Sequence, residues 1–326
     1  MSATTRDLFG AADGSAPATP GSYGEPPRGP HRLPDALRLG PVRLQVADLG
    51  RSLAFYQGIL GFHLLGEAGA RATLGAPATD AGPATELVEL VERPGAAPAP
   101  HRGRLGLFHV AYLLPTRAAL GRFVEHLAAR GLRPGAGDHH VSEAFYLADP
   151  DGLGVEVYAD RPRSAWRRVG RELMMATDPV DVPALVRAAH DPAAGAGPWA
   201  GAPAGTAVGH VHLHVGDTGR AAEFYGDGLG FDRTVWSYPG ALFFGAGGYH
   251  HHLGANTWAG PGARPPGEGD ARLLEWTVEL PAAADVAAAA ASLAAAGHAV
   301  EPGADGSALA RDPWGTTLRL RPTAAP

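Results

Sequence analysis

The chain contains an internal duplication. The segment 208–231, VGHVHLHVGDTGRAAEFYGDGLGF, repeats in altered form the segment 39–62, LGPVRLQVADLGRSLAFYQGILGF. Each copy begins with an alternating apolar run, which indicates a half-buried strand. An aspartate, Asp48 or Asp217, follows at the position that caps a helix. The two copies differ where chemistry is concerned, because His210 and His212 stand where the first copy has Pro41 and Arg43.

Two further segments follow the same pattern. One begins with the apolar run LGLFHVAYLL at 105–114, and the other with RLLEWTVELP at 272–281. Each continues into a helical pattern and ends in a closing strand after a turn, DPDG or DPWG. The sequence therefore predicts an α+β fold of four βαβββ units arranged as two tandem modules. Numbered in chain order, units one to four begin with the segments that start at residues 39, 105, 208 and 272.

The composition of successive segments suggests the domain boundaries. Residues 1–36 are rich in Gly, Pro, Ser and Ala and are predicted to form a disordered leader, because they have few large apolar side chains. The first module is expected at 37–163 and the second at 207–326. Between them, residues 164–206 are expected to be a linker with one short helix, in VDVPALVRAAHD.

Charge and cysteine content exclude several classes of function. The net charge is -6 and the basic residues are scattered, so neither nucleic acid nor a membrane surface is an expected partner. No apolar run approaches the roughly 20 residues that span a bilayer, and no signal peptide is evident, so a cytoplasmic location is the default. The chain has no cysteine, so a metal would have to be held by histidines and carboxylates.

Histidine is the residue type that points to a site. His109 and His210 stand at the head of the first strand of units two and three, and Glu156 lies in the apolar closing strand of unit two. A carboxylate there costs several kcal/mol if it faces the core unpaired, so it either faces solvent or has a cation. Two imidazoles and one carboxylate suit non-haem Fe(II), and the set could also hold Mn(II) or Zn(II). The alternative is that both histidines are ordinary hydrogen-bonded strand residues and Glu156 is solvated.

Four motifs in order resemble the vicinal oxygen chelate (glyoxalase and extradiol dioxygenase) superfamily, in particular its bacterial catechol 2,3-dioxygenase type. The resemblance covers about residues 37–321. The motifs are VADLGRSLAFYQGILGF, ADPDGLGVEVYADRP, VGHVHLHVGDTGRAAEFY and GGYHHHLGANTW. The resemblance implies that the units pair into cupped mixed sheets, with one metal held between a pair.

The resemblance also implies roles for individual residues. The metal ligands would be His109, His210 and Glu156, and Tyr146 stands ten residues before Glu156 as the family requires. His251 matches the catalytic histidine best. The other expected site residues are His139 or His140 as a further catalytic histidine, and His250, His252 and Trp258 as substrate contacts.

The residues at the metal-ligand positions of the four units predict which two units pair to form the site. Unit four has Glu275 and Arg319 where a histidine and the glutamate should stand, and unit one has Pro41. A fixed cation at a ligand position repels a metal, so the site should bridge units two and three rather than units one and four. An alternative is a C-terminal site of His210, His251 and Glu275, which Arg319 would oppose.

The activity implied by the resemblance is extradiol cleavage of a catechol-like aromatic diol by Fe(II) and dioxygen, with Mn(II) as the second candidate metal. Paired modules of this kind suggest a homodimer. Two alternatives share the fold: a glyoxalase-like metal-dependent isomerase or lyase, and a metal-free protein that binds small molecules. Sites of the isomerases usually carry more than one carboxylate or amide ligand, whereas the set here has one carboxylate.

Overall fold

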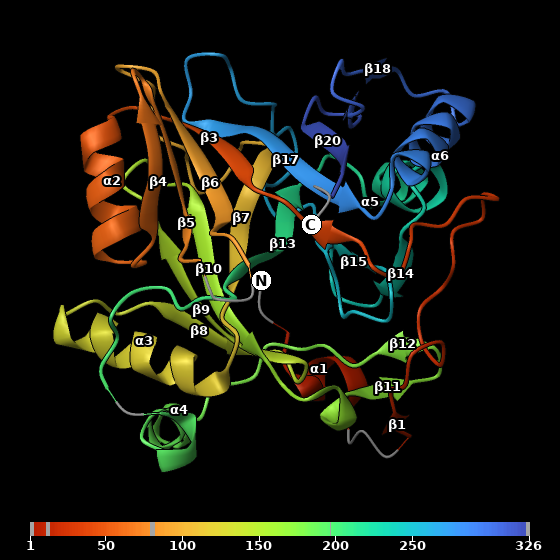
Figure 1. Ribbon diagram of the computed structural model, residues 1–326. Coiled ribbons are helices and arrows are strands. Elements are labelled where there is room, and N and C mark those ends of the chain that lie inside the picture. The colour runs from red at the N-terminus through yellow and green to blue at the C-terminus, as the bar shows by residue number, and fades with distance from the viewer. Residues whose placement is uncertain (1–2, 11–13, 79–81, 196, 324–326) are drawn as a thin grey trace.

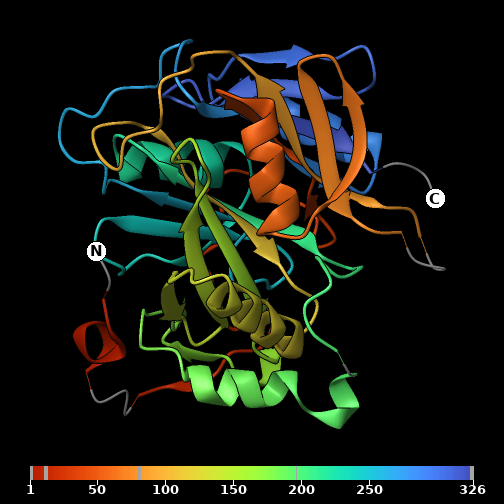
Figure 2. The same ribbon diagram turned by 90° about the vertical axis from the view of Figure 1, so that its left-hand side faces the viewer.

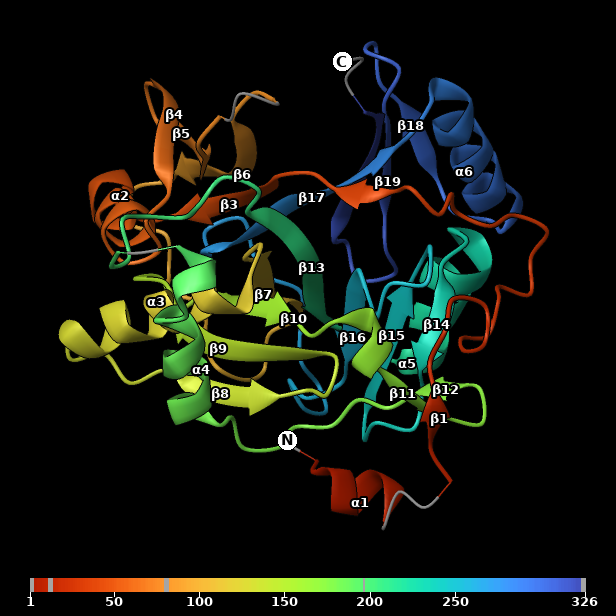
Figure 3. The same ribbon diagram turned by 60° about the horizontal axis from the view of Figure 1, so that its bottom comes forward.

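Two large, curled mixed sheets form the centre of the structure, a computed structural model that describes residues 3–10, 14–78, 82–195 and 197–323 (Figure 1). The strand order of the first sheet is β14-β15-β16-β13-β7-β10-β9-β8, and that of the second is β18-β19-β20-β17-β3-β6-β5-β4, with β2 beside β17. Figure 3 shows the two rows of strands one above the other. The predicted α+β fold of four βαβββ units is confirmed.

The strands of the first sheet are β7 (Gly106–Leu113), β8 (Gly135–Asp138), β9 (Ser142–Ala148), β10 (Gly154–Asp160), β13 (Ala207–His214), β14 (Asp232–Val235), β15 (Ala241–Gly245) and β16 (Leu253–Asn256). Those of the second are β2 (Arg38–Leu39), β3 (Val42–Val46), β4 (His63–Ala68), β5 (Arg71–Ala76), β6 (Thr85–Glu92), β17 (Arg272–Leu280), β18 (Val300–Pro302), β19 (Ala308–Arg311) and β20 (Thr317–Pro322).

Each sheet combines one unit from each half of the chain. Strand β7 of unit two pairs antiparallel with β13 of unit three, and β3 of unit one pairs antiparallel with β17 of unit four. The predicted pairing of units two and three is therefore confirmed. Neither sheet is built from the contiguous segment 37–163 or 207–326 alone.

The helices begin at the capping residues that the sequence predicts. Asp48 accepts a hydrogen bond from the Arg51 amide at the start of α2 (Leu49–Gly58), and Asp217 does the same for Arg220 at the start of α5 (Thr218–Ala221). The second copy differs, because α5 continues into a π-helical turn at Ala222–Gly228. The other helices of at least eight residues are α3 (Arg117–Ala129), α4 (Val182–Ala189) and α6 (Ala283–Ala295).

Helices α2 and α3 lie against the sheets, and α4 packs on α3 (Figure 2). None of the helices in the described part of the chain has the length and apolarity needed to cross a membrane.

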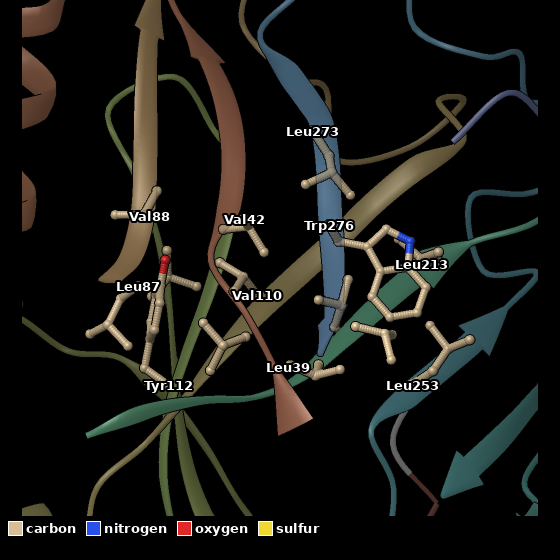
Figure 4. Close-up of a cluster of buried hydrophobic side chains, with 14 of the residues drawn as sticks. Leu39, Val42, Leu87, Val88, Val110, Tyr112, Leu213, Leu253, Leu273 and Trp276 are labelled. Atoms are coloured by element: carbon tan, nitrogen blue, oxygen red, sulfur yellow. The ribbon is translucent and has the colours of Figure 1, made fainter. Parts of the chain in front are cut away.

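The main core lies between the two sheets. Apolar residues from β3, β6 and β17 meet others from β7, β13 and β16 there (Figure 4). On β7, Val110 and Tyr112 belong to this core, and on β13 Val211 and Leu213 do. Because side chains alternate along a strand, the residues between them point to the opposite face of the first sheet. That face carries His109 and the other candidate ligands.

The described residues of the N-terminal segment, 3–10 and 14–36, are part of the folded body, which corrects the expectation of a disordered leader there. Leu33 and Tyr23 are buried, with 2% and 6% of their surface exposed. Strand β1 (Ala16–Pro17) pairs with β11 (Arg167–Val169), which pairs with β12 (Glu172–Leu173). Residues 3–36 also include the short helix α1 (Thr5–Phe9). The segment has too few apolar residues to form a hydrophobic core of its own. Those it has are buried against the hydrophobic residues of the repeat units.

Candidate metal centre

Three adjacent strands at the middle of the first sheet bring the predicted ligands together. Strand β7 lies between β10 and β13, and Ala111 on β7 pairs with Glu156 on one side and with His210 on the other. His109 is two residues before Ala111 and therefore points to the same face. The strand register alone thus places two imidazoles and one carboxylate on one patch of the sheet.

The three side chains converge on a common point. Nε2 of His109 lies 3.0 Å from Oε2 of Glu156, and Nε2 of His210 lies 3.3 Å from the same oxygen. All three prospective ligand atoms lie within 4.8 Å of one another. This arrangement rules out the alternative in which Glu156 is solvated, because only 2% of its surface is exposed.

The donor set fits a divalent cation. Within the described residues, the ion-pair partners of Glu156 are the two imidazoles, and the chain contains no lysine. Nε2 of His109 is buried and has no hydrogen-bond partner with acceptable geometry, although it lies next to Glu156. A buried carboxylate flanked by unused imidazole nitrogens lacks a fixed counter-charge, which a metal ion would supply.

Protonation states at neutral pH also suit metal binding. Burial lowers the pKa of His210 to about 4, so its ring is neutral. Burial alone would raise the pKa of Glu156, but the neighbouring imidazoles outweigh that effect and hold this pKa well below its usual value. A neutral imidazole and an ionised carboxylate are the forms that ligate metals.

The centre opens into a cavity of about 290 Å³. His109, His210 and Glu156 form part of its wall, and most of the remaining wall is aromatic or aliphatic. The other lining residues are Phe108, Gly135, Ala136, His139, Tyr146, Met175, Ala176, Thr177, His212, Tyr238, Phe243, His251 and Trp258. Trp258, which was expected to contact substrate, therefore does line this cavity.

His139 and Tyr146 form a hydrogen-bonded pair in the cavity wall. Nδ1 of His139 lies 2.7 Å from the carbonyl oxygen of Ala176, so this nitrogen carries the proton. Nε2 then accepts a hydrogen bond from the Tyr146 hydroxyl at 2.5 Å. Burial raises the pKa of Tyr146 well above its usual value, so the phenol stays protonated. His140 instead bonds Asp178 and is not among the residues that line the cavity, so His139 is the one of the two histidines whose position fits the predicted role.

The three consecutive histidines have different surroundings. The ring of His251 lines the cavity, with its centroid 4.1 Å from that of His210. Burial lowers the pKa of His251 well below its usual value, so this ring is neutral. His250 and His252 are buried outside the cavity lining, and His252 accepts a hydrogen bond from the Ala246 amide. The expectation that His250 and His252 contact substrate is therefore corrected.

Several lining residues were not predicted. His212 lies two residues after His210 and shares its face of β13, and its buried Nε2 has no hydrogen-bond partner among the described residues. The alternation of the strand was sufficient to find it. Met175, Ala176 and Thr177 come from the segment expected to be a linker, and Tyr238 follows β14. Nothing in their local sequence indicates that they reach this cavity.

The equivalent place in the second sheet holds ion pairs. Glu275 accepts two hydrogen bonds from Arg319, and Arg43 pairs with Glu89 nearby. Glu275 lies on β17 of the second sheet, whereas His210 lies on β13 of the first sheet and His251 lies in the loop that leads into β16 of the first sheet. The alternative site of His210, His251 and Glu275 is therefore wrong.

Sequence comparison identifies relatives that cover most of the chain. The family model described as glyoxalase/bleomycin resistance protein/dioxygenase superfamily matches residues 38–157 and 207–320. A catechol-2,3-dioxygenase of Bacillus subtilis (strain 168) is 42% identical over 267 residues, which are 81% of this chain and 90% of that protein.

Solved structures share the fold at low sequence identity. A putative dioxygenase from Bacillus subtilis is similar with a TM-score of 0.60 and 12% identity, over 90% of this chain and 87% of the other. Glyoxalase I from Zea mays has a TM-score of 0.50 and 16% identity, over 87% of this chain and 92% of the other. These likenesses concern the fold alone.

Proposed function

The chain belongs to the glyoxalase/bleomycin resistance protein/dioxygenase superfamily, and from this premise we propose that it is an extradiol dioxygenase that cleaves a catechol-like diol with Fe(II) and dioxygen. The observation that carries the proposal is the convergence of His109, His210 and Glu156 at the wall of an aromatic cavity. The catechol-2,3-dioxygenase relative supports the same reaction class.

The proposed cofactor is Fe(II), with Mn(II) as the second candidate. His109, His210 and Glu156 would hold it, each through one ligand atom. A set of two imidazoles and one carboxylate leaves adjacent coordination positions free, and a bound Fe(II) would supply Lewis acidity toward a diol and redox chemistry toward dioxygen. The single carboxylate and the cavity beside it favour this set over a closed structural site.

Proton handling falls to His251 in this proposal. The ring is neutral and lies in van der Waals range of His210, so it faces the place where a diol beside the metal would lie. A neutral imidazole there can accept the proton of a substrate hydroxyl and return it later in the reaction.

Tyr146 would orient the substrate by its hydroxyl. The phenol is protonated and its oxygen is held by His139, which is fixed in turn by the Ala176 carbonyl. The oxygen retains lone pairs that can accept a hydrogen bond from a diol hydroxyl. Phe108, Phe243 and Trp258 would hold the aromatic ring between apolar surfaces.

The apolar cavity wall supports an uncharged catechol as the proposed substrate class. No arginine lines the cavity among the described residues, and the chain has no lysine. A carboxylate on the substrate ring would be buried without a counter-charge, which disfavours its binding. Catechol itself and its alkyl derivatives fit this wall.

The test is anaerobic loading of the purified protein with Fe(II), followed by addition of catechol and then air. The proposal expects a yellow ring-opened product, formed only with iron and dioxygen present, and none from Glu156→Gln. Tight binding of catechol without turnover would indicate a binding protein. Isomerisation of a thiol adduct by Zn(II)- or Ni(II)-loaded protein, without ring cleavage, would indicate a glyoxalase-like enzyme.

A further inference from the structure

A row of hydrogen bonds leads from His251 away from the cavity. Nδ1 of His251 lies 2.7 Å from Nδ1 of His250, and Nε2 of His250 lies 2.9 Å from Oδ1 of Asp160. His250 is fully buried, whereas 28% of the Asp160 side chain is exposed. The row therefore connects a cavity residue on unit three to a carboxylate at the edge of unit two.

The direction of each hydrogen bond follows from the end of the row. An ionised carboxylate only accepts, so Nε2 of His250 must carry a proton. In a neutral His250 ring, Nδ1 then has a lone pair and accepts from Nδ1–H of His251. This leaves Nε2 of His251 without a proton, and Nε2 is the ring nitrogen that remains for the cavity.

We propose that His250 and Asp160 are positioning residues that fix His251 in the tautomer whose Nε2 lone pair faces the substrate. This inference rests on the proposed function of the cavity, since it makes His251 ready to accept a proton from a diol hydroxyl. Without the row, either ring nitrogen of His251 could carry the proton. The hydrogen bond made by one nitrogen decides the state of the other.

The same row of hydrogen bonds provides a transfer path for the proton that His251 accepts. When the O–H bond of the substrate breaks and an Nε2–H bond forms on His251, the Nδ1–H bond of His251 can break as Nδ1–H forms on His250. The positive charge then lies on His250, in contact with the Asp160 carboxylate. Reversal of these steps returns the proton, so no further reactant is needed.

Two tyrosines hold Asp160 in place. The Tyr249 hydroxyl donates to Oδ1 of Asp160 at 3.3 Å, and the Tyr158 hydroxyl lies 2.7 Å from the Tyr249 hydroxyl. The ring of Tyr249 also packs on that of His250, with 4.1 Å between centroids. Asp160 and His250 are 90 residues apart in the chain and belong to different units, so this arrangement exists only because units two and three share a sheet.

The direct test reads the tautomer by ¹⁵N NMR of the imidazoles in protein that is metal-free or loaded with diamagnetic Zn(II). We expect the wild type to show His251 protonated at Nδ1 and bare at Nε2. His250→Phe, which removes the acceptor, should shift His251 toward the Nε2–H form. His250→Asn, whose side-chain oxygen can still accept from Nδ1–H, should keep the wild-type tautomer. An Nε2–H signal for His251 in the wild type would overturn the inference.

Kinetics of the iron-loaded enzyme give the second measurement. His250→Phe should lower kcat by about 10–100-fold with KM within about two-fold, and His250→Asn should recover most of kcat. Asp160→Asn removes only the charge at the exposed end and should lower kcat by a smaller factor. The matched control is Asp178→Asn, because Asp178 pairs with His140 at 3.0 Å, has the same 28% exposure and lies outside the cavity. This variant should keep the wild-type kcat.

The two measurements separate failure of this inference from failure of the proposed function. Wild-type protein that cleaves no catechol but shows the expected tautomer refutes the dioxygenase proposal alone. Ring cleavage that is equally fast in wild type, His250→Phe and Asp160→Asn overturns the positioning role. If His250→Phe does not fold, Asp160→Asn, altered only at a partly exposed carboxylate, still decides the outcome by its kcat against that of Asp178→Asn.

Discussion

Arg319 donates two hydrogen bonds to Glu275, at 2.7 and 3.0 Å, at the place in the second sheet that corresponds to Glu156 and His109 in the first. Arg319 pairs with Thr277, two residues after Glu275, just as Glu156 pairs with Ala111, two residues after His109. One duplicated framework thus carries a convergent ligand set in one sheet and an ion pair in the other. The guanidinium in the second sheet supplies the positive charge that a metal would supply in the first.

We expect one metal ion per chain for this reason. Metal analysis of Fe(II)- or Mn(II)-loaded protein should give a stoichiometry near one. Glu156→Gln should weaken binding by more than the roughly 10–100-fold that loss of an outer-shell partner costs. The matched double variant Glu275→Gln, Arg319→Gln removes the pair from the other sheet and should leave the stoichiometry unchanged. A stoichiometry of two would contradict the assignment.

The repeat is what made the centre predictable from sequence. His109 and His210 stand at equivalent points of the repeat, Glu156 lies on the closing strand of unit two, and strand alternation places the three on one face of the sheet. The same pattern predicted that units two and three share a sheet, because Arg319 and Pro41 exclude a ligand set from the other pair. The sequence did not distinguish His139 from His140, because that choice depends on which ring reaches Tyr146.

The remaining cavity wall depends on long-range packing that no local pattern encodes. Met175 and Thr177 lie in a segment whose composition resembles a linker, yet they fold over the first sheet. The amide of Thr177 donates to the Ala3 carbonyl, and the Ala3 amide donates to the Tyr238 hydroxyl. A segment expected to be disordered thus supports the wall. Its few apolar residues gave no sign of this, because the surface that buries them belongs to other units.

Tyr146→Phe should lower kcat by about 100-fold, because the substrate loses the hydroxyl that His139 orients. Steady-state kinetics with catechol will measure the change, with kcat expected to fall more than KM rises. Tyr112→Phe is the matched control. Its hydroxyl is buried outside the cavity and has no hydrogen-bond partner in the part of the chain that the structure describes, so its loss should leave kcat within about two-fold of the wild type. Equal effects of the two changes would argue against a role for Tyr146.

Uncharged catechols should be preferred over carboxylated ones. Burial of an unpaired carboxylate costs about 2–3 kcal/mol, which corresponds to a loss of about 30–160-fold in kcat/KM. The measurement compares catechol and methylcatechol with dihydroxybenzoate. Met175→Arg would place a cation in the cavity wall and should reduce the difference in kcat/KM between the neutral and the carboxylated substrates. Equal kcat/KM values for the neutral and acidic substrates in the wild type would refute this assignment of substrate class.

Leu33→Ala should destabilise the protein, because the N-terminal segment is packed rather than mobile. Leu33 is 2% exposed, and truncation of a buried leucine costs about 2–5 kcal/mol. Urea unfolding of the metal-free protein measures the change. The control is Leu64→Ala, since Leu64 on the edge strand β4 is 41% exposed and its truncation should cost less than about 0.5 kcal/mol. A Leu33 variant as stable as the control would support a mobile leader.

The stability of the metal-free protein should fall as the pH drops below about 6.5. Burial lowers the pKa of His210 to about 4 and that of His252 to about 3, against 6.5 in the unfolded chain. Between those values the unfolded chain binds protons that the folded chain does not, so each residue lowers the free energy of unfolding by about 1.4 kcal/mol per pH unit as the pH falls. Above pH 6.5 both rings are neutral in either state and the effect vanishes.

Urea titrations at pH 7, 6 and 5 measure this slope. His252→Leu should reduce the slope by the contribution of one histidine, about 1.4 kcal/mol per pH unit. The reason is that His252 is buried outside the cavity and titrates only on unfolding. His190→Gln is the control, since the His190 side chain is 68% exposed and bonds only Glu125 among the described residues. Its slope should match the wild type. A stability that stays level from pH 7 to 5 would mean that these buried imidazoles accept protons in the folded state, and the neutral metal-binding form assigned to His210 would then be wrong.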